Sequence, residues 1–241
     1  MITSGGMSFT AKAAGDFIVN GKDPASLFNT ATDITAANIE IVNTDGGIVA
    51  GAYFTAKATG DFIAKGKYSS FLFNTTTLDI TAANVEAVNE AGSIGCTTNE
   101  FSIESTGDIL LDGNSTGAPL LSVLKLNLKG NDITLTNNKT AMILSSYGDE
   151  SAVNIDATGS VVIKNASSTP MISANTYSSI TTVYIKAADI EIENKGTGMI
   201  LACTPVLTAT EGDISVKANA NSPGISGYAI TATHDFTGDG Y

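Results

Sequence analysis

The sequence predicts an all-β protein, a three-sided β-solenoid of about ten coils of 22–30 residues. Three observations support this prediction: a repeated unit of mostly 22 to 25 residues, an apolar period of two inside each unit, and almost no helical periodicity. The composition agrees, because the abundant Ile, Thr, Asn and Gly are typical of strands joined by tight turns. We therefore expect one β-solenoid domain over residues 1–241.

The repeat consists of two alternating segments. FTAKAAGDFIVNGK at 9–22 returns as FTAKATGDFIAKGK at 54–67, and ITAANIEIVN at 34–43 returns as ITAANVEAVN at 80–89. No single unit can bury its own inward side chains, so we expect the units to stack into one continuous core. The units begin near Phe9, Thr32, Phe54, Leu78, Phe101, Leu126, Val153, Val183, Val206 and Tyr228.

Each unit is expected to contain three strands. In the first strand, Phe54, Ala56 and Ala58 point inward while Thr55 and Lys57 point outward. A corner of Gly, Asn and Asp follows, because these residues tolerate left-handed backbone angles, and then a second strand begins. Third, short apolar runs occur at 26–29, 46–51, 70–74, 119–123, 141–145, 170–174 and 198–202. Extra loop is expected at 145–151 and 165–182, and such insertions often lie on the binding face of a solenoid.

Charge and cysteine usage exclude several classes of function. The net charge is −12, and the twelve basic residues are all lysines, so the bidentate fork that reads phosphate and guanine is missing. We expect no nucleic-acid partner. Cys96 and Cys203 lack the spacing of a metal site or a disulfide framework. No apolar run is long enough to span a bilayer, so no membrane insertion is expected.

Four short segments carry a family resemblance. SLFNTA at 26–31, FLFNTT at 71–76 and NDITLTNNKTA at 131–141 resemble FxxN motifs, and GGIVAG at 46–51 resembles a GGA[ILV] motif although it lacks the Ala after its two glycines. These are motifs of right-handed parallel β-helix proteins of bacterial cell surfaces, which include autotransporter passengers and polymorphic outer-membrane adhesins. The resemblance implies a right-handed parallel β-helix and an extracellular or cell-surface location.

One outward column of the first strands contains two carboxylates. Glu104 and Asp156 should lie two coils apart, about 9 to 10 Å, with Lys129 between them. An inverting glycosidase could use this separation, so a polysaccharide-cleaving enzyme is one alternative. The other interpretation, which we favour, is a charge ladder in which Lys129 neutralises its neighbours. The column runs Lys12, Thr35, Lys57, Thr81, Glu104, Lys129, Asp156, Lys186.

A second outward column, on the second strands, alternates apolar with mostly acidic residues. Its apolar members Ile18, Ile63, Leu110 and Val162 form a possible contact face for a partner or for another copy of the chain, unless loops or neighbouring side chains cover them. The column runs Ile18, Glu40, Ile63, Glu86, Leu110, Thr134, Val162, Glu191, Ser215.

The C-terminal segment DFTGDGY at 235–241 has the spacing of a calcium loop. Asp235, Thr237 and Asp239 fit the first ligand positions of an EF-hand or dockerin-type loop, so calcium could bind here and a dockerin-like module could begin here. The alternative is an acidic turn that closes the last coil. Apart from this calcium, no cofactor is expected, and no catalytic residue is assigned, His234 included. The chain is expected to be a segment of a longer protein.

These observations favour a non-enzymatic extracellular adhesin or surface stalk. Its partner would be a molecule or glycan on a host or neighbouring cell, which the rod would meet through loops and a repetitive face. Two alternatives stay open: a structural subunit that self-assembles end to end or laterally, and a β-helix that binds or cleaves polysaccharide.

Overall fold

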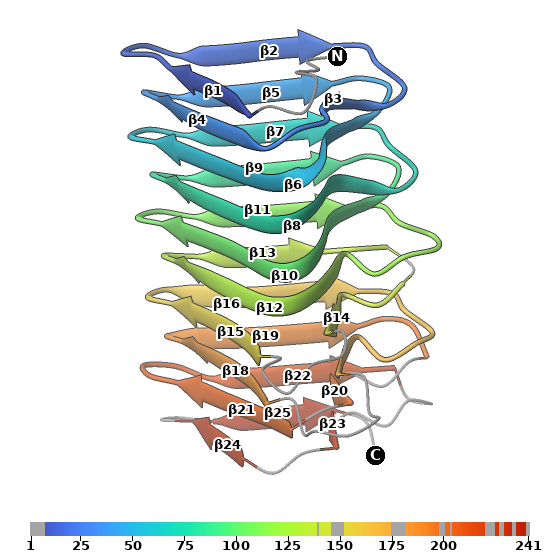
Figure 1. Cartoon of the computed structure of the whole chain (residues 1–241). Coiled ribbons are helices and arrows are strands. Elements are labelled where there is room, and N and C mark those ends of the chain that lie inside the picture. The colour runs from blue at the N-terminus through green and yellow to red at the C-terminus, as the bar shows by residue number, and fades with distance from the viewer. Residues whose placement is uncertain are drawn as a thin grey trace.

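The computed structural model describes residues 8–138, 140–145, 152–174, 182–197, 201–202, 204–219, 225–226, 229–232 and 235–239. These residues form strands β1 to β25 and no helix. All pairings between strands are parallel, from β1 with β4 to β22 with β25. The coils stack into a rod with the chain's N-terminus at one end and its C-terminus at the other (Figure 1). The β-solenoid predicted from the repeat is confirmed.

Each coil contributes strands to three faces. The first face contains β1 (Phe9–Lys12), β4 (Thr32–Ala36), the second halves of β6 (Gly47–Ala58), β8 (Phe71–Ala82), β10 (Ser93–Ser105) and β12 (Leu121–Gly130), then β15 (Ala152–Ala157), β18 (Thr182–Ala187), β21 (Thr204–Ala209) and β24 (Ala229–Ala232). The second face contains β2 (Phe17–Gly21), β5 (Ile39–Asn43), β7 (Phe62–Gly66), β9 (Val85–Asn89), β11 (Ile109–Gly113), β13 (Ile133–Thr136), β16 (Ser160–Asn165), β19 (Asp189–Asn194), β22 (Ile214–Ala218) and β25 (Phe236–Asp239). The third face contains β3 (Ser26–Phe28), the first halves of β6, β8, β10 and β12, then β14 (Ile143–Ser145), β17 (Ile172–Ala174), β20 (Leu201–Ala202) and β23 (Ile225–Ser226).

The core is a set of inward rows that run along the rod. In β6, Phe54 and Ala56 are fully buried whereas Lys57 is exposed, as the period of two predicts. Ile34, Ala36 and Ile39 of the ITAANIEIVN segment are buried as well. Such rows of stacked apolar side chains remove from water the surface that one coil alone would expose.

Within the described residues, nine coils have all three strands and the tenth has only β24 and β25. The predicted count of about ten coils is therefore slightly too high for complete coils. The predicted start at Val206 is wrong by one residue, because Val206 pairs with the outward Tyr184 and the inward row runs through Leu207. The corner before Ile214 contains Glu211 as well as Gly212, so it is one residue longer than the corner before Phe62. An alignment through the second strand therefore places the start of the first strand one residue too late.

One inward row explains why the sequence repeats every two coils rather than every coil. This row, which we call the asparagine row, lies where the second-face strands end and alternates Gly with Asn in its first half. Its members are Gly21, Asn43, Gly66, Asn89, Gly113, Asn137, Asn165, Asn194 and Ala218. The five asparagines are buried, with exposed fractions of 0 to 6%.

Each of these asparagines binds the backbone of the loop in the preceding coil. Asn89 Oδ1 accepts a hydrogen bond from the Tyr68 amide (2.9 Å), and Asn89 Nδ2 donates to the carbonyl oxygens of Ser70 (3.1 Å) and Ser93 (2.8 Å). Asn43 does the same one repeat earlier, with the Asp23 amide and the Gly47 carbonyl among its partners. The side chain thus satisfies backbone groups that the turn leaves unpaired.

The glycines of the asparagine row leave room for a leucine. A Cβ at Gly21, Gly66 or Gly113 would overlap a methyl group of Leu27, Leu72 or Leu120, which enters the third face of the same coil. In coils with Gly the leucine fills this corner, and in coils with Asn the amide clamps the loop of the preceding coil. The two kinds alternate from Gly21 to Gly113, whereas Asn137, Asn165 and Asn194 follow one another in consecutive coils.

Candidate functional site

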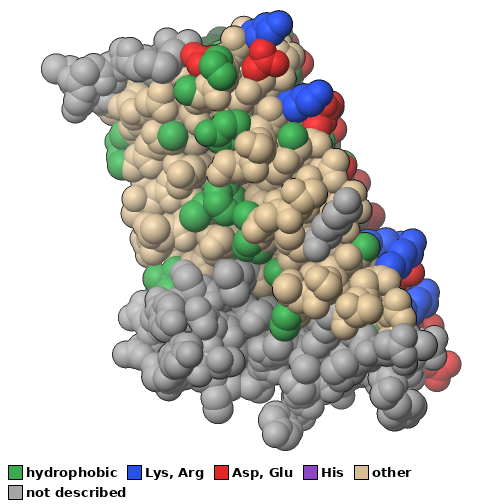
Figure 2. Space-filling view, turned by 90° about the vertical axis from the view of Figure 1, so that its right-hand side faces the viewer, with side chains coloured by type: hydrophobic (Ala, Val, Ile, Leu, Met, Phe, Trp, Pro, Cys, Tyr) green, Lys and Arg blue, Asp and Glu red, His purple; other side chains and the backbone are tan. Residues whose placement is uncertain are grey.

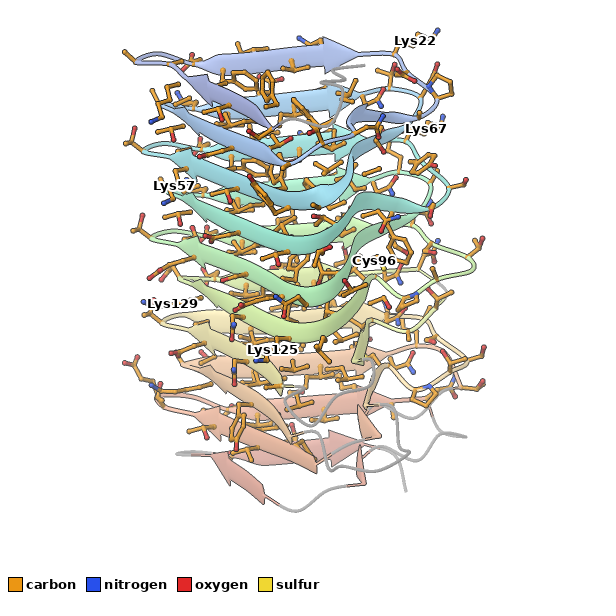
Figure 3. All side chains as sticks on the ribbon, in the orientation of Figure 1. Lys22, Lys57, Lys67, Cys96, Lys125 and Lys129 are labelled. Carbon is orange, nitrogen blue, oxygen red and sulfur yellow. The ribbon has the colours of Figure 1, made fainter. Side chains whose placement is uncertain are left out.

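The first-face column is continuous, and its predicted members pair with one another from Lys12 to Lys186. Lys129 Nζ lies 2.6 Å from Glu104 Oε1, and Lys186 Nζ lies 3.9 Å from Asp156 Oδ1. The Glu104 carboxylate raises the pKa of Lys129 above its usual value. Figure 3 places Lys129 at the edge where the first-face strands end. The two candidate acids therefore lie in an exposed ladder of ion pairs, which is the arrangement that the charge-ladder interpretation predicts.

The second-face column is continuous as well, from Ile18 to Ser215. Ile18 is 56% exposed, whereas Ile63, Leu110 and Val162 are half-buried. The neighbouring outward column contributes Val42 and Val88, which lie between these residues in the alternate coils. Apolar side chains thus zigzag along the second face. The two valines were not among the predicted contact residues, although they alternate with Asn20 and Lys65 in the repeated sequence.

Ion pairs fill the spaces between the apolar residues of the second face. Lys65 Nζ lies 2.8 Å from Glu86 Oε1, and Glu191 receives both Lys164 (3.0 Å) and Lys217 (3.3 Å). The Lys164 hydrogen bond is the main cause that lowers the pKa of Glu191, and Lys217 lowers it further, while partial burial opposes both. The second face is therefore a mixed surface of apolar ridges and paired charges.

The corner between the first and second faces carries a ladder of Asp and Asn side chains. Asn84 Nδ2 donates to Asp61 Oδ1 (2.8 Å), and the Asp108 amide donates to Asn84 Oδ1 (3.0 Å). The same pattern continues to Asp132, whose Oδ1 accepts from the Ser160 amide (2.6 Å). This corner ladder runs Asp16, Asn38, Asp61, Asn84, Asp108, Asp132, Ser160. Its carboxylates are held in fixed positions along one edge of the rod.

A groove of about 650 Å³ lies between the corner ladder and the second-face column. Ile63, Glu86 and Leu110 line it on the second face, and Asp61, Asp108 and Asp132 line it at the corner. Sequence reasoning identified Ile63 and Leu110 as a contact face but did not foresee the acidic wall beside them. The signal was present in the repeated GDF and GDI tripeptides at 60–62 and 107–109.

The third face is less charged. Figure 2 shows the side of the rod that lies at the right in Figure 1. Charged side chains gather along one edge of this view, and much of the remaining described surface is uncharged. Outward residues of the third face include Asn74, Cys96 and Ser122, which are paired in register. Burial raises the pKa of the partly exposed Cys96 thiol, so this thiol is mostly protonated at neutral pH. The third-face strand at 93–97, which contains Cys96, was not among the predicted apolar runs.

At the C-terminus, Phe236–Asp239 forms β25 and pairs with β22. The Asp235 amide donates to Asp213 Oδ1 (3.0 Å), so Asp235 occupies the corner position that Asp61 and Asp108 occupy in earlier coils. An extended strand does not wrap its side chains around one ion, as a calcium loop must. In the part of the chain that the structure describes, no three His, Cys, Asp or Glu side chains are placed to hold a metal. Calcium binding by Asp235, Thr237 and Asp239 stays a prediction.

Several predicted features lie wholly or partly outside the described residues. These are residues 146–151 and 175–181 of the two long loops, residues 198–200 of the last predicted apolar run, the predicted unit start at Tyr228, Cys203, His234 and residues 240–241. In the described part of the chain, no helix has the length and apolar character needed to cross a membrane.

The chain matches no family model, no curated protein and no solved structure. The fold defines the chain as a parallel β-solenoid with three strands in each complete coil. Its function is inferred from the geometry of its surface.

Proposed function

We propose that this chain is the rod of an extracellular adhesin or surface stalk, a non-enzymatic β-helix from a bacterial cell surface that carries a repetitive face for binding. The observation that supports it best is the continuity of the outward columns. The same kinds of side chain recur every second coil along the second face, so the rod offers many equivalent contacts to an extended partner. Multiple weak contacts along one axis raise avidity without a deep pocket.

The structure of the outward columns also bears on the enzyme alternative. Both candidate acids, Glu104 and Asp156, have exposed side chains (59% and 56%) and lysine partners. Each carboxylate is therefore engaged in an ion pair at an exposed position and is not held in a site that excludes water. This arrangement favours a binding role.

Screening the purified rod on glycan and extracellular-matrix arrays tests the proposal, with a parallel assay for polysaccharide cleavage. We expect reproducible binding to a surface molecule and no cleavage. Robust cleavage that is lost in Glu104→Ala or Asp156→Ala, together with blank arrays, would overturn the proposal in favour of an enzyme.

A second candidate function is self-assembly into filaments. In the first described coil the inward residues Phe9, Phe17 and Val19 are half-buried, whereas the inward residues of the next coil, Ile34 and Ile41, are fully buried, so a further coil has apolar surface to pack on. Half-buried inward residues beside strand edges can stack on another coil. Electron microscopy over a concentration series decides between the two, since short monodisperse rods at every concentration would exclude filaments.

A further inference from the structure

We propose that the groove beside the corner ladder binds a basic, proline-rich peptide in the polyproline II conformation, laid along the axis of the rod. This inference rests on the proposed function, since it names the partner chemistry of one face of a binding rod. Three properties of the groove carry it: its charge, its apolar floor and its period.

The charge of the groove selects a cationic partner. Asp61, Asp108 and Asp132 line one wall, and Glu86 adds a fourth carboxylate whose charge Lys65 offsets. The wall carboxylates are held by hydrogen bonds from the next coil, as when Asn84 Nδ2 donates to Asp61 Oδ1. Anions that are already fixed lose little entropy when a lysine binds, so the wall is preorganised for cations. The net charge of −12 disfavours a second copy of the chain as the occupant.

The floor of the groove selects a partner that also carries apolar groups. Ile63 and Leu110 line the groove and are half-buried, so part of each side chain still contacts water. Covering this apolar surface stabilises a complex in a way that charge alone does not. Among the residues that line this groove, no aromatic ring is exposed to stack on a sugar, since Phe62 is fully buried. The floor therefore favours a peptide over a glycan.

The period of the groove selects the conformation of the peptide. Asp61 and Asp108, like Ile63 and Leu110, are two coils apart, which is about 9.6 Å at ordinary strand spacing. A polyproline II helix advances about 9.3 Å in one turn of three residues, so every third side chain meets an equivalent position. In a β-strand, side chains on one face recur at about 6.7 Å, and they lose register within two contacts.

The experiment measures binding of a fluorescent peptide, Lys-Pro-Leu repeated four times, to the full chain by anisotropy at low and physiological salt. The matched controls are Glu-Pro-Leu repeated four times and a scrambled peptide of the same composition. We expect saturable binding of the first peptide only, weakened by salt. No binding below 1 mM, or equal binding of the scrambled peptide, would overturn the inference.

The variant Asp61→Asn with Asp108→Asn removes two wall charges without disturbing the fold, because Asn38 and Asn84 already occupy this corner position in alternate coils. We expect it to weaken binding by about 5-fold or more. The control Asp33→Asn with Asp79→Asn removes the same charge from the first face and should change binding less than about 2-fold. Equal losses in both variants would mean non-specific attraction and would sink the inference.

Failure of this inference is distinguishable from failure of the proposed function. If the arrays give a glycan or matrix ligand while the peptide does not bind, the rod is still an adhesin and only the groove assignment is wrong. If the arrays are blank and polysaccharide is cleaved, the proposed function itself fails.

Discussion

Replacing Asn89 by Ala should destabilise the rod by about 3 kcal/mol, because this side chain is 1% exposed and makes four hydrogen bonds to backbone, of which the one from the Ala91 amide is long at 3.4 Å. Each such bond contributes about 1 kcal/mol net, and a buried group left unpaired costs about 1 to 3 kcal/mol. Truncation leaves the Tyr68 amide and the carbonyls of Ser70 and Ser93 without this partner. The bond to Ser93 is buried and those to Tyr68 and Ser70 are part-buried, so we expect a loss near the sum of about 1 kcal/mol for each bond.

Urea unfolding followed by circular dichroism measures this loss as a change in midpoint at constant slope. The matched control is Asn74→Ala, which removes the same groups from an exposed position and should cost less than about 0.5 kcal/mol. A loss below about 1 kcal/mol for Asn89→Ala, or equal losses for the two variants, would refute the clamp as a source of stability.

Three further predictions follow from the core, the ion pairs and the thiol. Gly66→Ala should cost about 1 to 3 kcal/mol in urea unfolding because its Cβ would overlap Leu72, whereas Gly15→Ala, with open space around it, should be near neutral; similar costs would contradict the packing argument. The folded pKa of Glu191 is lowered, so the stabilisation that its ion pairs give is present above its ordinary pKa of 4.5 and is lost as the pH falls through the folded pKa. Glu191→Gln should therefore cost about 0.5 to 1 kcal/mol at pH 7 and less in acid, measured by urea unfolding. A cost that did not change with pH would contradict that sign. Iodoacetamide at pH 7 should alkylate Cys96 more slowly in the folded chain than in urea, as peptide mapping would show, because burial raises its pKa; equal rates would contradict this.

The outward columns were predictable from sequence because they depend only on the alternation of a strand and on constant coil spacing. Lys12 to Lys186 and Ile18 to Ser215 needed no knowledge of partners, since parallel register carries equivalent positions of each unit into line. The error at Val206 shows where this reasoning ends: a longer corner containing Glu211 shifts the strand by one residue.

The role of the asparagine row could not be predicted from the sequence. Its role depends on partners about twenty residues earlier in the chain, such as Tyr68 for Asn89, and on the space that Leu72 occupies beside Gly66. Neither is a local property of the sequence. The groove is a different case, because its lining residues are close in sequence: Asp61 and Ile63, like Asp108 and Leu110, are two positions apart. What the sequence does not show is the hydrogen bonding from the next coil that fixes the corner carboxylates beside the apolar residues.

The alternation of Gly and Asn sets the unit in which this rod can change its length. Between Gly21 and Gly113, removal of one Asn coil would leave the loop of the preceding Gly coil without its clamp. Removal or duplication of two coils keeps both kinds in order. This part of the rod should therefore lengthen and shorten in steps of about 9.6 Å, two strand spacings at a time. The coils of Asn137, Asn165 and Asn194 already stack on one another, so single-coil changes should be tolerated better there.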